Sequence, residues 1–457
     1  MKGGSVITVI YGRASAAARS CSAIIGLALI AFGSSSVTAQ DTAAVHGLID
    51  TYADGVESQV IAWRRDIHQH PELSNREVRT AGLVADHLRS LGLEVTTGVA
   101  HTGVVGVLRG TKKGATSDLV VGLRADMDAL PVVERTGLAY ASTATSTYEG
   151  ADVGVMHACG HDNHVAILMG AASVLAQARD AFSGTVKFIF QPAEEGAPKG
   201  ERGGAALMIE EGVLANPAVD AIFGLHISQG GETGTVSYRS RGTMASAQRF
   251  DVEIQGRQTH AARPWAGVDP IAVGAQIVTA LQTIVSRNVD VTSTPAVVTV
   301  GSFHAGIRNN IVPDSASLSG TIRTFDPAVR TDIHKRITDI VEQIASAMGA
   351  SATVVIDPGV PVTFNDESLT SMALPTLQRV YGDEQVQTAG LLTGAEDFSF
   401  FQQRIPGFFF FIGARPKQIP LEQAIPNHSP LFYVDEEALL PGVKAMAGLA
   451  VDYLSKP

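Results

Sequence analysis

The amino-acid sequence predicts an α/β fold that is divided between two domains. Three predominantly apolar segments, at residues 119–123, 186–190 and 221–225, have the pattern of strands buried on both faces of a parallel sheet. Residues 250–356 follow the order βαββαβ, which is typical of a small ferredoxin-like domain. A chain of 457 residues is also too long for a single hydrophobic core.

The amino terminus, up to Ala39, has the features of a secretory signal rather than of a folded segment. It carries three basic and no acidic residues, an apolar stretch at 22–33 and small residues at 37–39. The apolar stretch is too short to span a membrane, and Cys21 precedes it, which argues against a lipoprotein. We predict cleavage after Ala39, or alternatively after Gln40, and export to a periplasm or the outside.

Charge and cysteine content narrow the range of functions. The formal charge of −11 includes +3 from the predicted leader, so the remaining chain carries −14. This acidic balance disfavours nucleic acid and anionic membranes as partners. Because Cys21 leaves with the leader, Cys159 has no partner for a disulfide within the exported chain. Its thiol is expected to be buried, reactive, paired between chains or bound to metal, and the neighbouring histidines and aspartate favour metal.

Two carboxylates follow the first buried strand. Asp126 and Asp128 stand two residues apart, so in an extended segment both lie on the same side. They occupy the carboxyl end of a strand, where open α/β sheets place their sites. The alternative is ordinary turn chemistry before Pro131. The elements expected ahead of this strand are helices at 44–70 and 76–91 and a strand at 104–109.

The densest group of potential metal ligands lies at residues 156–164, which read Met-His-Ala-Cys-Gly-His-Asp-Asn-His. Residues 165–178 have a helical pattern, so the group is expected on a tight turn at Gly160 that leads into a buried helix. Thiolate, imidazole and carboxylate groups are the ligands that hold zinc or a similar divalent ion. The alternative is a buried cysteine surrounded by unrelated surface histidines.

The second and third buried strands also end in potential ligands. Glu194 and Glu195 follow the strand at 186–190, and His226 is expected to cap the strand at 221–225. Adjacent residues of an extended chain point in opposite directions, so one glutamate can bind metal while the other acts as a general base. The alternative for the two glutamates is a solvated acidic loop.

The βαββαβ section carries polar residues of its own, and the main domain resumes after it. His260, Asn310 and Arg323 lie within this section. In the last part of the chain, the four phenylalanines of a strand at 408–412 are expected to pack in the core, and His428 lies on a loop. The other expected elements are strands at 250–254, 296–303, 315–324 and 351–356, helices within 267–288 and at 328–348 and 436–454, and a loop at 394–398 that opens a helix.

Taken together, these motifs resemble those of the N-acyl-amino-acid amidohydrolases, which include hippurate hydrolases, auxin-conjugate hydrolases and aminoacylases. This group is a branch of the two-metal aminoacylase and carboxypeptidase-G-like peptidase clan. The resemblance covers nearly the whole chain after the leader. It is carried by residues 64–74, 124–131, 156–164, 191–196, 224–226, 310–314, 320–326, 396–398 and 427–430.

The resemblance implies a zinc-peptidase-like α/β/α catalytic domain with an inserted ferredoxin-like lid that usually also forms the dimer. It implies two divalent ions per subunit, Zn²⁺ or Mn²⁺, with Co²⁺ or Ni²⁺ also possible. By motif, Glu194 corresponds to the general base, and Asp128 to the carboxylate that orients a metal-binding side chain. The implied metal ligands are Cys159, His161, Glu195, His226 and His428.

For the lid, the resemblance implies that His260 steadies the oxyanion, often across the dimer, and that Asn310 and Arg323 hold the carboxylate of the substrate. The sequence departs from the family pattern here. Residues 258–259 are Gln-Thr where the family often has Gly-Gly, and Trp265 stands where a histidine is common. We therefore expect the pocket beside the lid to be larger, flatter or more apolar. We expect His157 and His164 to support the metal ligands or to be structural. We expect His68, His70 and His304 to be surface or structural residues.

The predicted organisation is a signal peptide at 1–39, a catalytic domain at 40–245 and 357–457, and a lid and dimerisation domain at 246–356. The leading hypothesis is an exported hydrolase that cleaves the amide bond of an N-acyl or N-aroyl amino acid. A dipeptidase or carboxypeptidase with the same two-metal site is the alternative. A catalytically silent binding or metal-buffer protein would lack Glu194 or a ligand, and none is missing. The expected partners are a small-molecule substrate and a second copy of the chain.

Overall fold

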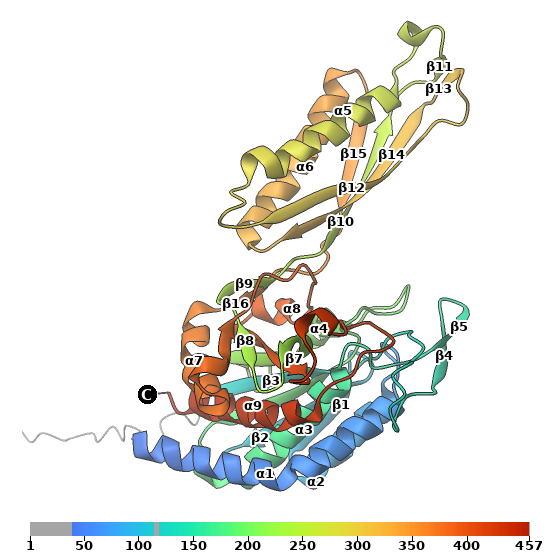
Figure 1. Ribbon diagram of the computed structural model, residues 1–457. Helices are drawn as coiled ribbons and strands as arrows, with labels where there is room; N and C mark the ends of the chain where they lie inside the picture. The colour runs from blue at the N-terminus through green and yellow to red at the C-terminus, as the bar shows by residue number, and fades with distance from the viewer. Residues whose placement is uncertain (1–38, 114–117, 457) are drawn as a thin grey trace, which may run out of the picture. The chain divides into compact units, whose positions relative to one another are not determined.

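The computed structural model describes residues 39–113 and 118–456 (Figure 1). The predicted leader lies outside these residues, apart from Ala39. The main sheet has eight strands in the order β1-β2-β6-β3-β7-β18-β8-β17. Its centre is parallel, from β6 through β3 and β7 to β18, whereas β1 and β2 are antiparallel at one edge. The bounds are Glu94–Val99 (β1), Gly103–Arg109 (β2), Val120–Asp126 (β3), Thr185–Gln191 (β6), Ala221–Glu232 (β7), Val236–Tyr238 (β8), Val386–Thr388 (β17) and Gly407–Arg415 (β18).

Helices cover both faces of this sheet, which confirms the predicted α/β class (Figure 1). One hydrophobic core joins the sheet to α1, α2, α3, α7 and α9, and a second core joins the opposite face to α4 and α8. The bounds are Ala39–Gln69 (α1), Val78–Ser90 (α2), His161–Gln177 (α3), Gly204–Glu210 (α4), Glu367–Tyr381 (α7), Ser399–Gln402 (α8) and Leu439–Leu454 (α9).

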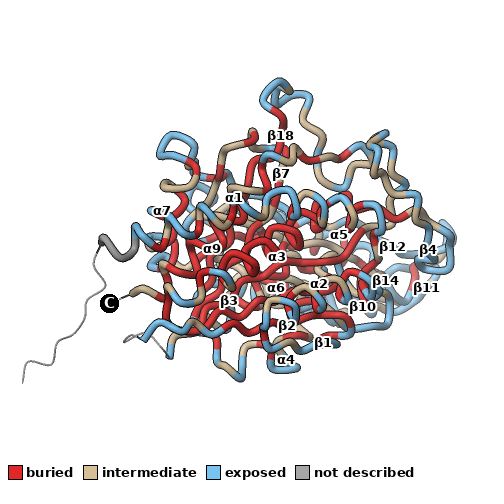
Figure 2. The backbone as a smooth tube through the Cα atoms, turned by 90° about the horizontal axis from the view of Figure 1, so that it is seen from below, coloured by how far each residue is buried: buried red, intermediate tan, exposed pale blue. Residues whose placement is uncertain are grey.

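Strand β18 separates these two cores. Its side chains alternate between the faces, as strand geometry requires. Phe408 and Phe410 enter the first core, and Phe409 and Phe411 enter the second. The rings of Phe408 and Phe410 stack with centroids 5.7 Å apart. The four phenylalanines therefore pack as the sequence predicted, and Figure 2 shows β18 and α3 as largely buried segments.

A second, four-stranded antiparallel sheet has the order β12-β14-β10-β15. It packs with α5 and α6 around a hydrophobic core of its own, and Asp269 and Asp326 cap these helices by accepting backbone N–H groups. The strand and helix order agrees with the predicted βαββαβ unit; the exact domain limits stay a prediction. The bounds are Gln248–Gln255 (β10), Pro270–Thr283 (α5), Ala296–Ala305 (β12), Ser315–Thr324 (β14), Pro327–Ala347 (α6) and Ser351–Ile356 (β15).

Three short two-stranded pairings complete the described structure. β11 pairs with β13, and both lie between β10 and β14 in the sequence. β9 pairs with β16, and β4 pairs with β5. Within the described residues, no helix is both long and apolar enough to cross a membrane. The bounds are Thr145–Tyr148 (β4), Ala151–Gly154 (β5), Arg241–Met244 (β9), Thr259–His260 (β11), Ile311–Val312 (β13) and Thr363–Asn365 (β16).

Several element boundaries differ from those expected. β7 continues to Glu232, so His226 lies inside the strand and does not cap it. α3 begins at His161, so this histidine and His164 belong to the first turn of the helix, not to the turn before it. The expected helix at 436–454 is a short 3₁₀ turn followed by α9. For β7 the physical reason is strand pairing, because β18 pairs with it as far as Glu232.

Candidate metal centre

The candidate ligands come from elements that meet at one edge of the main sheet. β3 ends at Asp126, β6 ends just before Glu194 and Glu195, and β7 carries His226. These three strands are adjacent and parallel, so their carboxyl ends share one edge. Helix α3 begins at the same edge with His161. The order of strands thereby gathers residues that lie far apart in the sequence.

The turn before α3 depends on Gly160. Its φ is +98°, in the left-handed region that glycine adopts at no steric cost. A Cβ atom at this position would lie 2.6 Å from Cγ2 of Ile227 on β7. The absent side chain lets the turn approach β7 closely. Cys159 and His161, which flank Gly160, are therefore held close to β7.

Five side chains form two overlapping groups of potential donors. Within each group, the donor atoms lie within 4.8 Å of one another. The sulfur of Cys159 is 3.3 Å from Nε2 of His226, and Nε2 of His428 is 2.9 Å from Oε1 of Glu195. Cys159 belongs to both groups, so its sulfur stands between the two sets of donors. The groups are Cys159, His161 and His226, and Cys159, Glu195 and His428.

His428 reaches this site through local backbone contacts. Its φ is +71°, and its amide donates to the carbonyl of Ala158 at 2.7 Å. The neighbouring Asn427 donates from Nδ2 to the carbonyl of Cys159, also at 2.7 Å. These bonds fasten the loop before α9 to the turn before α3. The side chain of His428 is 55% exposed, so the group that includes it faces the open side of the site.

The buried polar atoms of the site fit a divalent cation. Nε2 of His161 is buried without a hydrogen-bond partner, which is costly unless another group satisfies it. Burial, together with the neighbouring His164, lowers the pKa of His226 well below its usual value, so its imidazole is neutral and able to ligate. Burial raises the pKa of the Cys159 thiol, and a nearby cation would favour its thiolate. Sulfur, nitrogen and carboxylate donors together suit zinc and related ions.

Asp128 connects His161, a candidate metal ligand, to the loop that carries Glu194 and Glu195. Its carboxylate accepts the amides of Glu194 and Glu195 at 3.0 and 3.1 Å, and the hydroxyl of Ser74 at 2.8 Å. It also lies 3.3 Å from Nδ1 of His161. Burial alone would raise the pKa of Asp128, but the contact with His161 lowers it below its usual value. Asp128 is therefore a charged acceptor that orients both sides of the site.

Glu194 has the environment of a group that binds a proton readily. Its side chain is 8% exposed, and Oε2 lies 3.9 Å from Nε2 of His161. Oε1 accepts the amide of Asp397 at 3.3 Å. Burial, with the carboxylates of Glu396 and Glu195, raises the pKa of Glu194 well above its usual value. A raised pKa makes this carboxylate a better proton acceptor near neutral pH.

The remaining histidines near the site occupy interior positions. Nδ1 of His164 is 2.6 Å from Asp126, and its Nε2 accepts the amide of Ile227 at 2.9 Å, so neither nitrogen is free for a ligand. His68 is buried between Asp162 and Glu134, at 2.9 and 3.2 Å, which makes it structural rather than a surface residue. His157 is buried as well. His70 and His304 are exposed.

The hydrogen bonds of His260 and Arg323 are made to neighbouring residues of the lid itself. Nδ1 of His260 accepts the amide of Ala262 at 3.0 Å, and Arg323 donates to the hydroxyl of Thr321 at 2.7 Å. Asn310 is exposed. Among the hydrogen bonds and ion pairs of residues 39–113 and 118–456, none links these three side chains to the metal centre. Their roles rest on the motif resemblance alone.

Two charged residues at the site were not predicted from the sequence. Glu77, at the start of α2, accepts the amide of Ala193 at 2.9 Å. Arg124 is buried at the end of β3 and pairs with Asp126, Glu396 and Asp397 at 2.6, 3.0 and 3.0 Å. Arg124 lies within the motif at residues 124–131, and membership of that motif was the signal that could have identified it. Nothing in the local pattern around Glu77 indicates a contact with a loop so distant in sequence.

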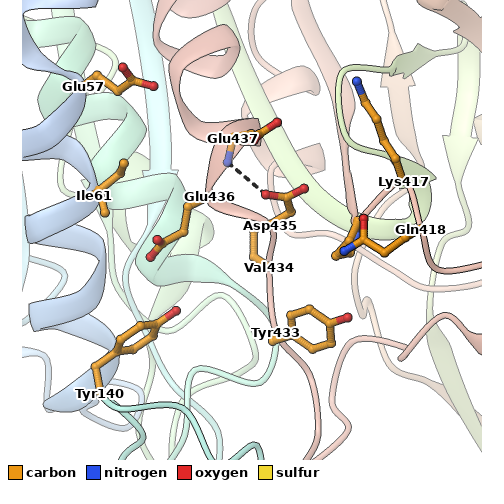
Figure 3. A pocket seen from close by; sticks show the side chains of 11 residues that line it. Glu57, Ile61, Tyr140, Lys417, Gln418, Tyr433, Val434, Asp435, Glu436 and Glu437 are labelled. Atoms are coloured by element: carbon orange, nitrogen blue, oxygen red, sulfur yellow. Dashed lines mark hydrogen bonds between the residues drawn. The ribbon is translucent and has the colours of Figure 1, made fainter.

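A surface cavity of about 680 Å³ lies beside α1 and the segment before α9 (Figure 3). Its lining includes Tyr140, Tyr433 and the acidic residues 435–437, but none of the candidate metal ligands. Glu436 accepts a hydrogen bond from the guanidinium of buried Arg64 at 3.2 Å. The same guanidinium stacks against the ring of Tyr140. The cavity is therefore separate from the candidate metal centre.

Comparisons with known proteins agree with this arrangement. The model of peptidase family M20/M25/M40 matches residues 122–452. Thermostable carboxypeptidase 1 of Saccharolobus solfataricus is 41% identical over 403 residues, which cover 88% of this chain and 97% of the relative. N-acetyl-L-cysteine deacetylase of Bacillus subtilis is 38% identical over 385 residues, which cover 84% of this chain and 86% of the relative. The solved structure of the Bacillus subtilis YXEP protein, described as a dinuclear metal-binding peptidase of family M20, has a TM-score of 0.71 and 35% identity, with 88% of this chain and 99% of that chain covered.

The matches extend over most of the chain and confirm the resemblance that the motifs carried. Their names include both a peptidase and a deacetylase, and both types of enzyme hydrolyse amide bonds. The chain therefore belongs to peptidase family M20/M25/M40 and is a metal-dependent hydrolase of the amidohydrolase and peptidase type.

Proposed function

We propose that the chain hydrolyses the amide bond of N-acyl or N-aroyl amino acids, giving a carboxylate and a free amino acid. The observation that carries the proposal is the position of Glu194, a buried carboxylate with a raised pKa, beside two groups of metal donors that share Cys159. A base next to a divalent ion is what metal-assisted hydrolysis requires.

The proposed cofactor is a pair of divalent ions, Zn²⁺ or Mn²⁺, with Co²⁺ or Ni²⁺ as further possibilities. Cys159, His161 and His226 would hold one ion, and Cys159, Glu195 and His428 the other. When bound, such ions act as Lewis acids and activate water for attack on the amide carbon. The description of the YXEP protein as a dinuclear metal-binding peptidase supports this number.

The protein side chains then handle the proton and the developing charge. Glu194 takes a proton from the attacking water and later gives it to the leaving amine. Asp128 holds the amides of Glu194 and Glu195, so the base and the neighbouring ligand keep fixed positions. His260 donates to the oxyanion; because its Nδ1 accepts the amide of Ala262, the proton of a neutral imidazole is on Nε2.

Specificity for an amino-acid product is proposed to come from the lid. Arg323 binds the free carboxylate of the substrate through its guanidinium, and Asn310 adds a second polar contact. The deacetylase relative supports an N-acyl substrate. A dipeptidase or carboxypeptidase is the second candidate, and the carboxypeptidase relative favours it. Both candidates use the same centre and differ in the group that precedes the scissile bond.

Export and dimerisation complete the proposal. The basic and then apolar leader, ending near Ala39, supports transport to a periplasm or the outside. Dimerisation through the lid is proposed from the resemblance to the amidohydrolase branch. Amino-terminal sequencing of protein recovered after expression with the leader tests the first point, and light scattering of the purified protein tests the second. A cell-retained protein that begins at Met1 would contradict export.

The decisive experiment is a substrate panel assayed with each metal. N-acetyl and N-benzoyl derivatives of one amino acid are compared with dipeptides that end in the same amino acid, each with Zn²⁺, Mn²⁺ and Co²⁺. We expect the highest kcat/KM for an N-acyl or N-aroyl amino acid. Exclusive cleavage of dipeptides would favour the second candidate. Hydrolysis of no amide with any metal would refute the proposal.

A further inference from the structure

Glu77 is a buried acidic residue that forms no ion pair within residues 39–113 and 118–456. Its exposed fraction is 0%. Oε1 accepts the amide of Ala193 at 2.9 Å, and Oε2 accepts the hydroxyl of Thr102 at 2.5 Å. Burying a carboxyl group is unfavourable unless its hydrogen bonds compensate. These two contacts therefore help to offset the cost of burying Glu77.

The contact with Ala193 is one of three that hold the loop after β6. Three successive amides, of Ala193, Glu194 and Glu195, donate to two buried carboxylates. Glu77 accepts the first, and Asp128 accepts the second and third at 3.0 and 3.1 Å. Successive amides that converge on anionic oxygens form a nest, an arrangement that stabilises a fixed loop conformation.

Ala193, the residue just before Glu194 in this loop, has an unfavourable backbone conformation. The φ of Ala193 is +52°, in the left-handed region that is disfavoured for a residue with a Cβ atom. Such a conformation persists only where surrounding contacts stabilise it. Asp128 holds the two later amides, so the amide of Ala193 itself depends on Glu77. Loss of that acceptor would let the backbone relax immediately before Glu194.

We infer that Glu77 is a positioning residue for Glu194, acting through its hydrogen bond to the amide of Ala193. The inference rests on the proposed function, in which Glu194 is the base. The far end of Glu194 is already restrained, because Oε1 accepts the amide of Asp397 at 3.3 Å. Glu77 restrains the near end through the preceding residue. Displacement of a reacting group by about 1 Å is enough to lower turnover roughly 10²-fold.

The role of Glu77 is that of an acceptor and does not depend on its charge. Burial and the neighbouring Asp128 raise the pKa of Glu77 to about 7. In the protonated form, Oε1 still accepts the amide of Ala193, and the acid proton turns to the oxygen of Thr102. Glutamine reproduces this pattern, since its amide oxygen accepts and its NH₂ group donates. Glu77→Gln is therefore the conservative variant.

Three variants of the metal-loaded protein separate positioning from general stability. Glu77→Ala is expected to lower kcat by about 10–100-fold with unchanged metal content. Glu77→Gln is expected to restore kcat to within about threefold of the wild type. Thr102→Val removes the other contact of the same carboxylate and is the matched control, with a lower Tm but a wild-type kcat. If the Ala variant does not fold, Glu77→Leu, which keeps the volume but has no acceptor, takes its place.

A double-mutant cycle tests whether Glu77 acts through Glu194. In a Glu194→Gln background, Glu77→Ala is expected to cause no further loss of kcat, because the base it positions is absent. The inference is overturned by wild-type kcat in Glu77→Ala, by equal losses in both backgrounds, or by a loss in Thr102→Val as large as in Glu77→Ala. Full activity of Glu194→Gln alone would instead refute the part of the proposed function that makes Glu194 the base. The two failures therefore give different results.

Discussion

Nε2 of His428 lies 2.9 Å from Oε1 of Glu195, although 233 residues (428 − 195) separate the two in the sequence. The contact joins the loop before α9 to the loop after β6, and Cys159 lies beside both. A cation held there would connect three segments of the fold. Ion binding and stability should therefore be coupled.

We predict that removing metal lowers the stability of the folded chain reversibly. An ion present at 100 times its Kd stabilises the native state by about 2.7 kcal/mol. The measurement is Tm after dialysis against a chelator and again after Zn²⁺ or Mn²⁺ is restored. Identical Tm values, with metal shown to be absent in one sample and present in the other, would argue against a bound ion that joins these loops.

We predict that Glu194→Gln keeps metal and fold but loses turnover. Removal of a general base typically costs about 10²–10⁴-fold in rate. Steady-state kcat and metal content are measured on the same preparation. A metal-replete variant with wild-type kcat would show that another group accepts the proton.

We predict that Cys159→Ser weakens metal binding by at least roughly 10–100-fold, the range found when even supporting residues of metal sites are changed. The sulfur is the donor common to both groups. Elemental analysis after equilibration with limiting metal gives the occupancy. Unchanged occupancy, together with a native thiol that reacts freely in the loaded protein, would exclude Cys159 as a ligand.

We predict that Arg323→Ala raises KM for an N-acyl amino acid by about tenfold or more, since hydrogen bonds to charged groups contribute about 1.5–3 kcal/mol. The corresponding amino-acid amide lacks the charge and should be affected little. The comparison is kcat/KM for acid and amide forms on both proteins. Equal losses would make Arg323 structural, and a wild-type preference for the amide would contradict an N-acyl-amino-acid substrate.

A pH-dependent prediction concerns Lys187, which lies on β6 away from the metal donors. Burial lowers its pKa to about 8, and Nζ donates to the carbonyls of Ala215 and Pro217 at 2.6 and 3.2 Å. The folded state thus disfavours the charged form, and this cost is complete below pH 8. It disappears as pH rises from about 8 to the unfolded pKa near 10.5, so stability increases by up to about 3 kcal/mol.

The measurement is the free energy of unfolding in urea at pH 7.5 and pH 10.5 for the wild type and Lys187→Met. Between pH 7.5 and pH 10.5, the free energy of unfolding of the wild type should rise relative to that of Lys187→Met. A difference that does not vary with pH would mean that Lys187 is solvated when folded.

The parts of the fold that local sequence patterns determine were predicted correctly. The strands at 315–324 and 351–356 have the expected bounds, and the phenylalanines of β18 pack in the core. The position of His226 was wrong because pairing with β18 extends β7 well past its apolar segment. Register with a neighbouring strand is a tertiary property that the segment itself does not encode.

The grouping of the candidate ligands was predictable where these residues belong to recognisable motifs, and their roles stay a prediction. Cys159, His161, Glu195 and His428 are brought together as the motifs implied. Glu77 was missed because its partner is a backbone amide of a distant loop, and an amide leaves no trace in the sequence. His68 was equally ambiguous, since burial between two carboxylates depends on packing rather than on local pattern.

The place of Cys159 in both donor groups makes the whole centre sensitive to chemical modification of one sulfur. Oxidation or alkylation of this one sulfur removes a donor from each group at once, so the centre should fail as a unit. Loss of His226 or of His428 removes a donor from only one group and should leave the other able to bind. In an oxidising compartment, retention of the ions would then protect the thiol on which both depend.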